Sequence, residues 1–183
     1  MNLKKLKIIG VILSFFLSFI FHFMYDLFPN FITSIIFPVN ESIFEHMKII
    51  FGSILISGVI QKIIVIKKNL NYNNICISNV LVAFLSIFIF LIMFLPIYSL
   101  IGENLPVVLI IMLFTYIISQ FLSIYIIKKE DMKKENFAIL LVIIIYIIFG
   151  IFTYFPLKNN FFIDPIDNFY GIEKKLCIQN NLK

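Results

Sequence analysis

Apolar residues in this chain are gathered into five long runs, which short polar segments separate. The runs cover residues 8–28, 43–66, 75–98, 105–127 and 137–155. Each is close to the ~20 residues that an α-helix needs to cross the hydrocarbon core of a bilayer. The pattern predicts an all-α membrane protein, a bundle of about five transmembrane helices. We expect a single integral membrane domain over residues 1–183, with a tail at 156–183.

The composition agrees with this class of protein. Hydrophobic residues make up 61% of the 183 residues and charged residues only 14%, whereas soluble domains average about 25% charged residues. The mean hydropathy is +1.04. So few charges cannot cover a water-soluble surface, so the predicted partner is the lipid bilayer. The many Ile, Phe and Asn residues, with Lys as the basic residue throughout, are typical of an AT-rich genome and favour a bacterial cytoplasmic membrane.

The lysines predict how the helices are oriented. They cluster at 4–7, 62–68 and 128–134, whereas the alternate loops at 29–40 and 99–104 contain none. Cytoplasmic loops of membrane proteins carry an excess of Lys and Arg, so the N-terminus should be inside and the tail outside, although the tail also contains lysines. Because the lysines flank helices, the net charge of +5 does not predict a nucleic-acid partner.

The first apolar run is expected to remain as a helix. It is too long for the apolar core of a signal peptide, and no Ala precedes Ala83 to form a cleavage site.

Polar residues recur at steps of four along most of the runs, as in Ser14, Ser18, His22 and Asp26. Such a row follows one slowly turning stripe of a helix. We interpret the Ser and Thr positions as contacts that let membrane helices approach closely. Residues 75–98, nearly featureless after Asn79, should then face lipid more than the other runs.

The candidate site comprises polar residues from three segments at the predicted external ends of the helices. The candidate catalytic residues are His22, Asp26, Glu41, Glu45 and His46, accompanied by Tyr25, Asn40, Lys48, Asp164 and Tyr170. Carboxylates outnumber fixed cations here, so the cluster should attract a proton or a divalent metal. Zinc and manganese accept His with carboxylate, and the candidate ligands are His22, Asp26, Glu45 and His46. The spacing matches no established metal motif, and carboxylate pairs can equally perform acid–base chemistry.

The tail has two interpretations. Pro165 disfavours helix at Asp164, so the segment should turn there. It could then fold back as a lid that brings an aspartate towards the cluster, or lie loosely attached along the membrane surface.

Several of these motifs resemble one family. They are His22-x-x-Tyr25-Asp26, Asn40-Glu41-Ser42-x-x-Glu45-His46-x-Lys48, Phe152-Thr153-Tyr154-Phe155-Pro156, Asp164-Pro165 and Tyr170-Gly171. The chain resembles a family of small multi-pass bacterial membrane proteins that is defined only as a domain of unknown function. Phe44 stands in place of the Trp that the family pattern would have, and Asp26 in place of Glu. The resemblance implies that the three external segments belong together, and it implies no activity.

Three classes of function fit these observations. One is a metal- or carboxylate-dependent hydrolase of a lipid or envelope substrate. Another is a small cation or solute carrier, whose polar stripes would continue the site inward. The third is a non-catalytic membrane assembly partner that uses the cluster to bind a protein.

Overall fold

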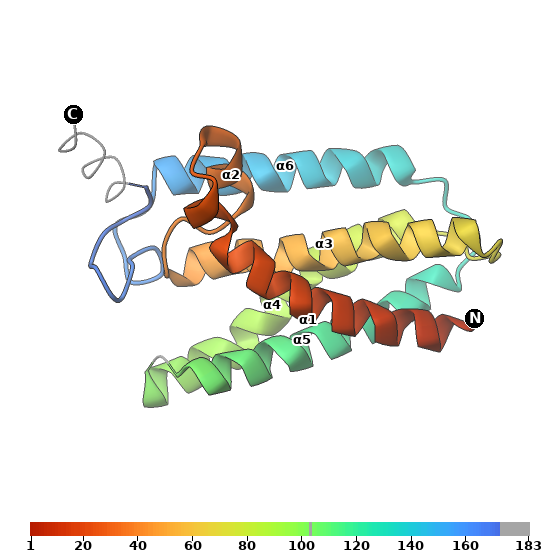
Figure 1. Ribbon diagram of the computed structural model, residues 1–183, viewed down its shortest axis with the longest axis horizontal. Coiled ribbons are helices and arrows are strands. Elements are labelled where there is room, and N and C mark those ends of the chain that lie inside the picture. Colours follow the sequence, from red (N-terminus) through yellow and green to blue (C-terminus); the bar gives the residue numbers. More distant parts are fainter. Residues whose placement is uncertain (103, 173–183) are drawn as a thin grey trace. The chain divides into compact units, whose positions relative to one another are not determined.

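The computed structural model describes residues 1–102 and 104–172, and these residues form six α-helices and no β-strand (Figure 1). The helices are α1 (Leu3–Leu27), α2 (Phe31–Ile36), α3 (Ile43–Lys67), α4 (Ile75–Ile101), α5 (Leu105–Ile127) and α6 (Glu135–Tyr154). A single β-bridge joins Ile163 to Tyr170 within the tail.

The prediction of five membrane helices is confirmed, because α1, α3, α4, α5 and α6 are each long and apolar enough to cross a bilayer. The chain therefore has the build of a multi-pass membrane protein. α4 continues beyond its predicted end at residue 98 and stops at Gly102, whose φ of +69° suits a residue without a Cβ. The short helix α2 was not predicted.

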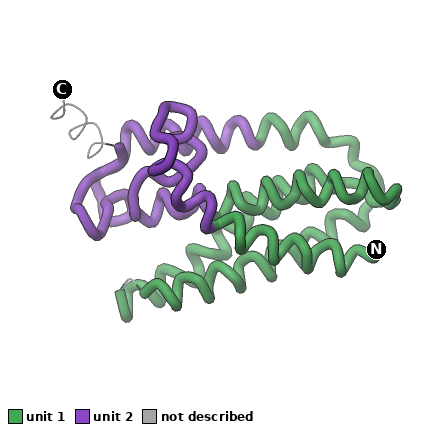
Figure 2. Tube along the Cα trace, in the orientation of Figure 1, with its two compact units in different colours: residues 1–18, 50–141 green, residues 19–49, 142–183 purple. Residues whose placement is uncertain are grey.

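The chain divides into two compact units (Figure 2). Unit 1 comprises residues 1–18 and 50–141, and unit 2 comprises residues 19–49 and 142–183. α1, α3 and α6 each contribute residues to both units. All the predicted site residues belong to unit 2.

Unit 1 has a polar centre within its apolar helices. The buried Lys7 ammonium donates hydrogen bonds to the side-chain oxygens of Gln61 (2.8 Å) and Asn79 (3.3 Å). Gln61 also donates to Gln120 (3.1 Å). A Cβ at Gly10 would collide with the amides of Gln61 and Gln120, so this glycine permits the close approach of α1.

The prediction that residues 75–98 face lipid more than the other runs is wrong. Ser78, Asn79 and Ser86 of α4 are buried, and Ser78 donates a hydrogen bond to the Ser123 carbonyl of α5 at 3.0 Å. In their most apolar stretches α4 has 39% of its residues buried and α6 has 22%. The buried face of α4 also includes apolar residues such as Val82, Ala83 and Phe90, so the scarcity of polar residues did not indicate exposure to lipid.

Aromatic contacts form the core of unit 2. The Phe44 ring, at the start of α3, stacks on Phe162 of the tail with centroids 4.8 Å apart. It also meets Phe149 and Phe152 of α6 edge-on, both at 5.8 Å. These contacts place α3, α6 and the tail together around the segment that carries the site.

Candidate functional site: a His–Glu–His cluster

Three of the predicted site residues meet in unit 2. His22 lies on α1, His46 on the first turns of α3, and Glu41 in the loop before α3. Nε2 of His22 lies 3.6 Å from Oε1 of Glu41, and Nε2 of His46 lies 3.6 Å from Oε2 of Glu41. One ligand atom from each of the three residues lies within 4.8 Å of the other two, an arrangement that could hold a metal ion.

The loop that presents Glu41 is fixed by hydrogen bonds to its backbone. The Glu41 amide donates to Oδ2 of Asp164 at 3.2 Å, and the Val39 amide donates to Oε2 of Glu45 at 3.0 Å. The Asn40 side chain accepts from the Ser42 amide at 2.9 Å and donates to the Gly171 carbonyl at 2.9 Å. Because these bonds leave the Glu41 carboxylate unused, it is free to reach both imidazoles.

Ser42 begins α3 and orients His46. Its hydroxyl accepts the Glu45 amide at 3.3 Å, which is half of a capping box. Its carbonyl lies 3.0 Å from Nδ1 of His46. A carbonyl can only accept, so Nδ1 carries a proton, and Nε2 is the ring nitrogen that points to the cluster.

Glu45 lies next to the cluster in sequence, but its side chain takes part in a different interaction. Its carboxylate pairs with the Lys48 ammonium at 2.7 Å, and both side chains are buried. Oε1 of Glu45 also accepts a hydrogen bond from Thr153 of α6 at 2.9 Å. Both carboxylate oxygens therefore have partners.

Lys48 extends this buried pair to α2. Its ammonium donates to the Ser34 carbonyl at 2.8 Å and to the Thr153 hydroxyl at 2.6 Å. The Ser34 hydroxyl lies 2.9 Å from that of Tyr154. A single ammonium thus joins the start of α3 to α2 and α6.

The tail folds onto the site loop. Oδ1 of Asp164 accepts the amides of Ile166 (2.8 Å) and Asp167 (3.2 Å), which makes the predicted turn after Pro165. Its other oxygen holds Glu41, as described above. The Phe44 amide donates to the Phe161 carbonyl at 3.1 Å. Asp164 therefore binds the backbone of the Glu41 loop and is not a member of the His–Glu–His cluster.

The other predicted residues lie outside the cluster. Asp26 is exposed and contributes no ligand atom to it. Tyr25 is buried, and Tyr170 is half-buried at the β-bridge. The predicted residues therefore separate into the His–Glu–His cluster, the side chains that hold its loop and helix, and a few outside the cluster.

Sequence reasoning gave no role to the two partners of the buried pair. Thr153 appeared only within a family motif, and Ser34 was not singled out. Thr153 interrupts an apolar helix and could have been noticed for that reason. Ser34 belongs to α2, which a capping box between Asn30 and Thr33 begins. The Asn-x-x-Thr pattern after Pro29 is the local signal that could have predicted this helix.

No curated protein and no solved structure matches the chain. A family model, described as "Family of unknown function (DUF6512)", matches residues 1–172. The chain belongs to this family.

Proposed function

We propose that this protein binds a divalent transition metal, with zinc as the best fit, through His22, Glu41 and His46, and uses it to hydrolyse a lipid or envelope substrate at the external membrane surface. The observation that carries the proposal is the convergence of the three ligand atoms within 4.8 Å of one another. They come from α1, the Glu41 loop and α3.

The distances favour a bridging ion over direct hydrogen bonds. An N–H···O hydrogen bond is about 2.7–3.2 Å long, and both His–Glu distances are 3.6 Å. Ligand atoms that surround zinc at about 2.0–2.1 Å in a tetrahedron lie about 3.4 Å from each other. The two His–Glu distances end on different oxygens of Glu41 and all three ligand atoms lie within 4.8 Å, so small side-chain movements would bring the three residues to three corners of a zinc tetrahedron.

The surroundings also suit a catalytic ion. Protein-bound zinc with three ligands keeps a fourth position for water, and zinc makes that water a nucleophile near neutral pH. The side chains of His22 and Glu41 are each 32% exposed, so a substrate has access. The hydrogen bond between His46 and the Ser42 carbonyl is the outer-shell contact that metal-binding histidines usually have.

In this proposal the remaining candidates have supporting roles. Glu45 and Lys48 hold the start of α3, and Asn40 and Asp164 hold the Glu41 loop. Asp26 is not a ligand. The whole chain acts as one integral membrane domain of a bacterial cytoplasmic membrane, and lysine asymmetry assigns the cluster to the external face.

A cation carrier would need a path of oxygen or imidazole ligands through the helices. In unit 1 the side-chain oxygens of Gln61 and Asn79 instead bind the ammonium of Lys7, an unsuitable neighbour for a cation. We therefore rank the hydrolase above the carrier. A purely protein-binding role ranks lower because it does not explain why the three side chains are spaced like metal ligands.

The first experiment measures zinc bound to purified protein. Wild type should retain about one zinc per chain after dialysis, and His22→Gln and His46→Gln should each weaken binding by about 10-fold or more, since each removes a direct ligand. Asp26→Asn, one helical turn beyond His22, is the matched control and should bind like wild type. Equal zinc content in all variants would reject the site.

The second experiment tests hydrolysis separately. Wild type loaded with zinc is assayed in vesicles that contain phospholipid esters, and product should be lost in His46→Gln but not in Asp26→Asn. Zinc bound at the cluster without any turnover would reject the hydrolase while leaving the metal site intact.

A further inference from the structure

A cleft at the lysine-rich end of unit 1 is separate from the site described above. It lies where the loop after α3 and the loop after α5 meet the start of α4, and it consists of two adjoining hollows of about 300 and 440 Å³. Asn74, Cys76, Asp131 and Glu135 line both hollows. These volumes fall in the range of small-molecule sites.

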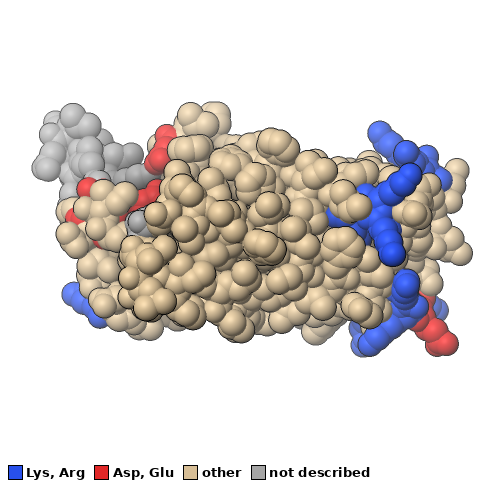
Figure 3. All heavy atoms as spheres, turned by 90° about the horizontal axis from the view of Figure 1, so that it is seen from below, with Lys and Arg blue, Asp and Glu red and all other residues tan. Residues whose placement is uncertain are grey.

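Lysines outnumber carboxylates in the two loops that form this cleft, and Asp131 and Glu135 are the carboxylates that line it. Figure 3 shows most of the Lys side chains on that face of the molecule gathered at one end of the view. Lys62, Lys133 and Lys134 line the cleft. The neighbouring lysines, outside the lining, are Lys67, Lys68, Lys128 and Lys129.

One side chain, that of Asn74, holds together two of the segments that line the cleft. Nδ2 of Asn74 donates to the carbonyls of Lys129 (3.1 Å) and Glu130 (2.9 Å), while its Oδ1 accepts the Met132 amide at 2.9 Å. Asn74 has a φ of +58°, which Asn tolerates better than most residues. This one side chain therefore fixes the loop after α5 against α4.

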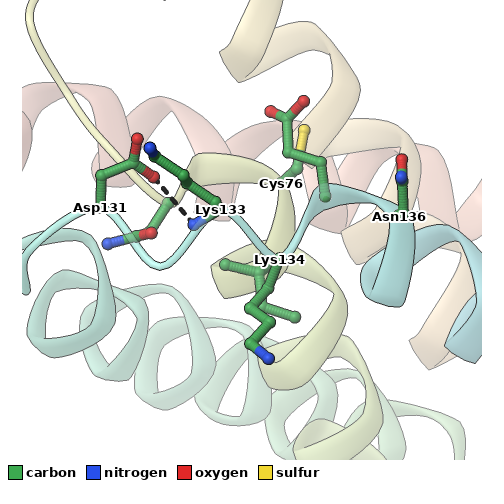
Figure 4. Close-up of a pocket in the computed structure, with 8 residues that line it drawn as sticks. Cys76, Asp131, Lys133, Lys134 and Asn136 are labelled. Atoms are coloured by element: carbon green, nitrogen blue, oxygen red, sulfur yellow. Dashed lines mark hydrogen bonds between the residues drawn. The ribbon is translucent and has the colours of Figure 1, made fainter.

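The backbone conformation of the loop after α5 sets the directions of its lysines. Lys133 has a φ of +49°, and its amide donates to Oδ1 of Asp131 at 3.0 Å. Figure 4 shows Lys133 and Lys134 projecting from the loop in different directions beside Cys76. Lys62 pairs with Glu135 at 3.1 Å, so Lys133 and Lys134 are the lining cations that no described carboxylate pairs with.

We propose that this cleft binds the headgroup of an anionic membrane phospholipid, and that the exposed side chains of Lys133 and Lys134, which diverge in the structure, turn towards its phosphate when it binds. The lining is amphiphilic, because Val65, Ile66 and Leu70 lie beside the polar groups. An apolar wall beside cations suits a lipid, which carries acyl chains, better than a free phosphate ion. Basic clusters next to membrane helices attract anionic headgroups at roughly 1 kcal/mol per lysine. This attraction is general, and the cleft would confine it to one binding position.

The test measures binding of individual phosphatidylglycerol molecules by native mass spectrometry of protein in mixed micelles with phosphatidylcholine. Wild type should retain phosphatidylglycerol in preference to phosphatidylcholine. Lys133→Gln with Lys134→Gln should weaken this binding by about 30-fold. Lys67→Gln with Lys68→Gln makes the same charge change outside the cleft and should have a much smaller effect.

A second variant separates the cleft from simple charge. Asn74→Gly keeps every lysine and tolerates the positive φ, yet removes the amide that holds the loop, so it should also lose the preference. Equal losses in the two lysine pairs, or an unchanged preference in Asn74→Gly, would overturn the proposal. Equal binding of inorganic phosphate would also overturn it, in favour of a free-anion site.

Discussion

At the scale of single residues, the buried pair of Glu45 and Lys48 should dominate the stability of unit 2. Removing one member of a buried ion pair leaves an uncompensated charge and costs about 3–5 kcal/mol, whereas replacing both can be nearly neutral. We expect Lys48→Met to lower the free energy of unfolding by that amount, and Glu45→Gln with Lys48→Met to lower it much less. Denaturant unfolding in detergent micelles measures both. A double variant no more stable than Lys48→Met would contradict the pairing.

The residue scale also shows what the sequence could predict of the site. The residues that meet were recognisable, since His, Glu and Lys are rare inside membrane helices and expensive there. The sequence did not show which of these residues contact one another. Glu41 and Glu45 cannot be told apart by sequence pattern. The fold shows that Glu45 binds Lys48 and Thr153, which is far away in the chain, whereas Glu41 lies beside the histidines.

At the scale of elements, the tail should remain attached only while Gly171 is glycine. Its φ is +55°, and a Cβ there would collide with the Thr153 carbonyl of α6. Gly171→Ala should therefore release the tail and speed cleavage after the exposed Lys158 about tenfold, since the left-handed conformation alone costs a non-glycine residue about 1–2 kcal/mol. Limited proteolysis with a lysine-specific protease measures this.

Gly102→Ala is the matched control for this experiment. Gly102 also has a positive φ, of +69°, but nothing lies within 4 Å of where its Cβ would be. It should therefore leave cleavage after Lys158 unchanged. Slow cleavage in both variants would contradict the claim that attachment of the tail requires glycine at position 171.

The elements differ in how well the sequence predicted them. Apolar length alone predicts the five long helices, because a bilayer requires a minimum span. α2 has six residues and no such requirement, so its formation depends on the Asn30 cap and on tertiary contacts such as that of Ser34 with Lys48. The lipid-facing side of α4 was mispredicted because hydropathy records how apolar a helix is and not which neighbour covers it.

At the scale of the whole molecule, the number of spans decides on which sides the ends lie. Five helices are able to cross a bilayer, and an odd number of crossings places the two ends of the helical region on opposite sides. The lysine asymmetry predicts that the lysine-free loops at 29–40 and 99–104 lie on the external side. On that prediction the His–Glu–His cluster would face outward.

Cysteine labelling in intact cells tests this orientation. In a variant whose Cys76 and Cys177 are replaced by Ser (Cys177 lies outside the described residues), Lys158→Cys should react with a membrane-impermeant thiol reagent. Lys68→Cys and Lys129→Cys should react only after the cells are opened, because they follow α3 and α5 on the opposite side. All three lysines are exposed, so accessibility within the fold does not distinguish them. Labelling of Lys68→Cys from outside, with protection of Lys158→Cys, would invert the molecule and move the proposed metal site to the cytoplasmic face.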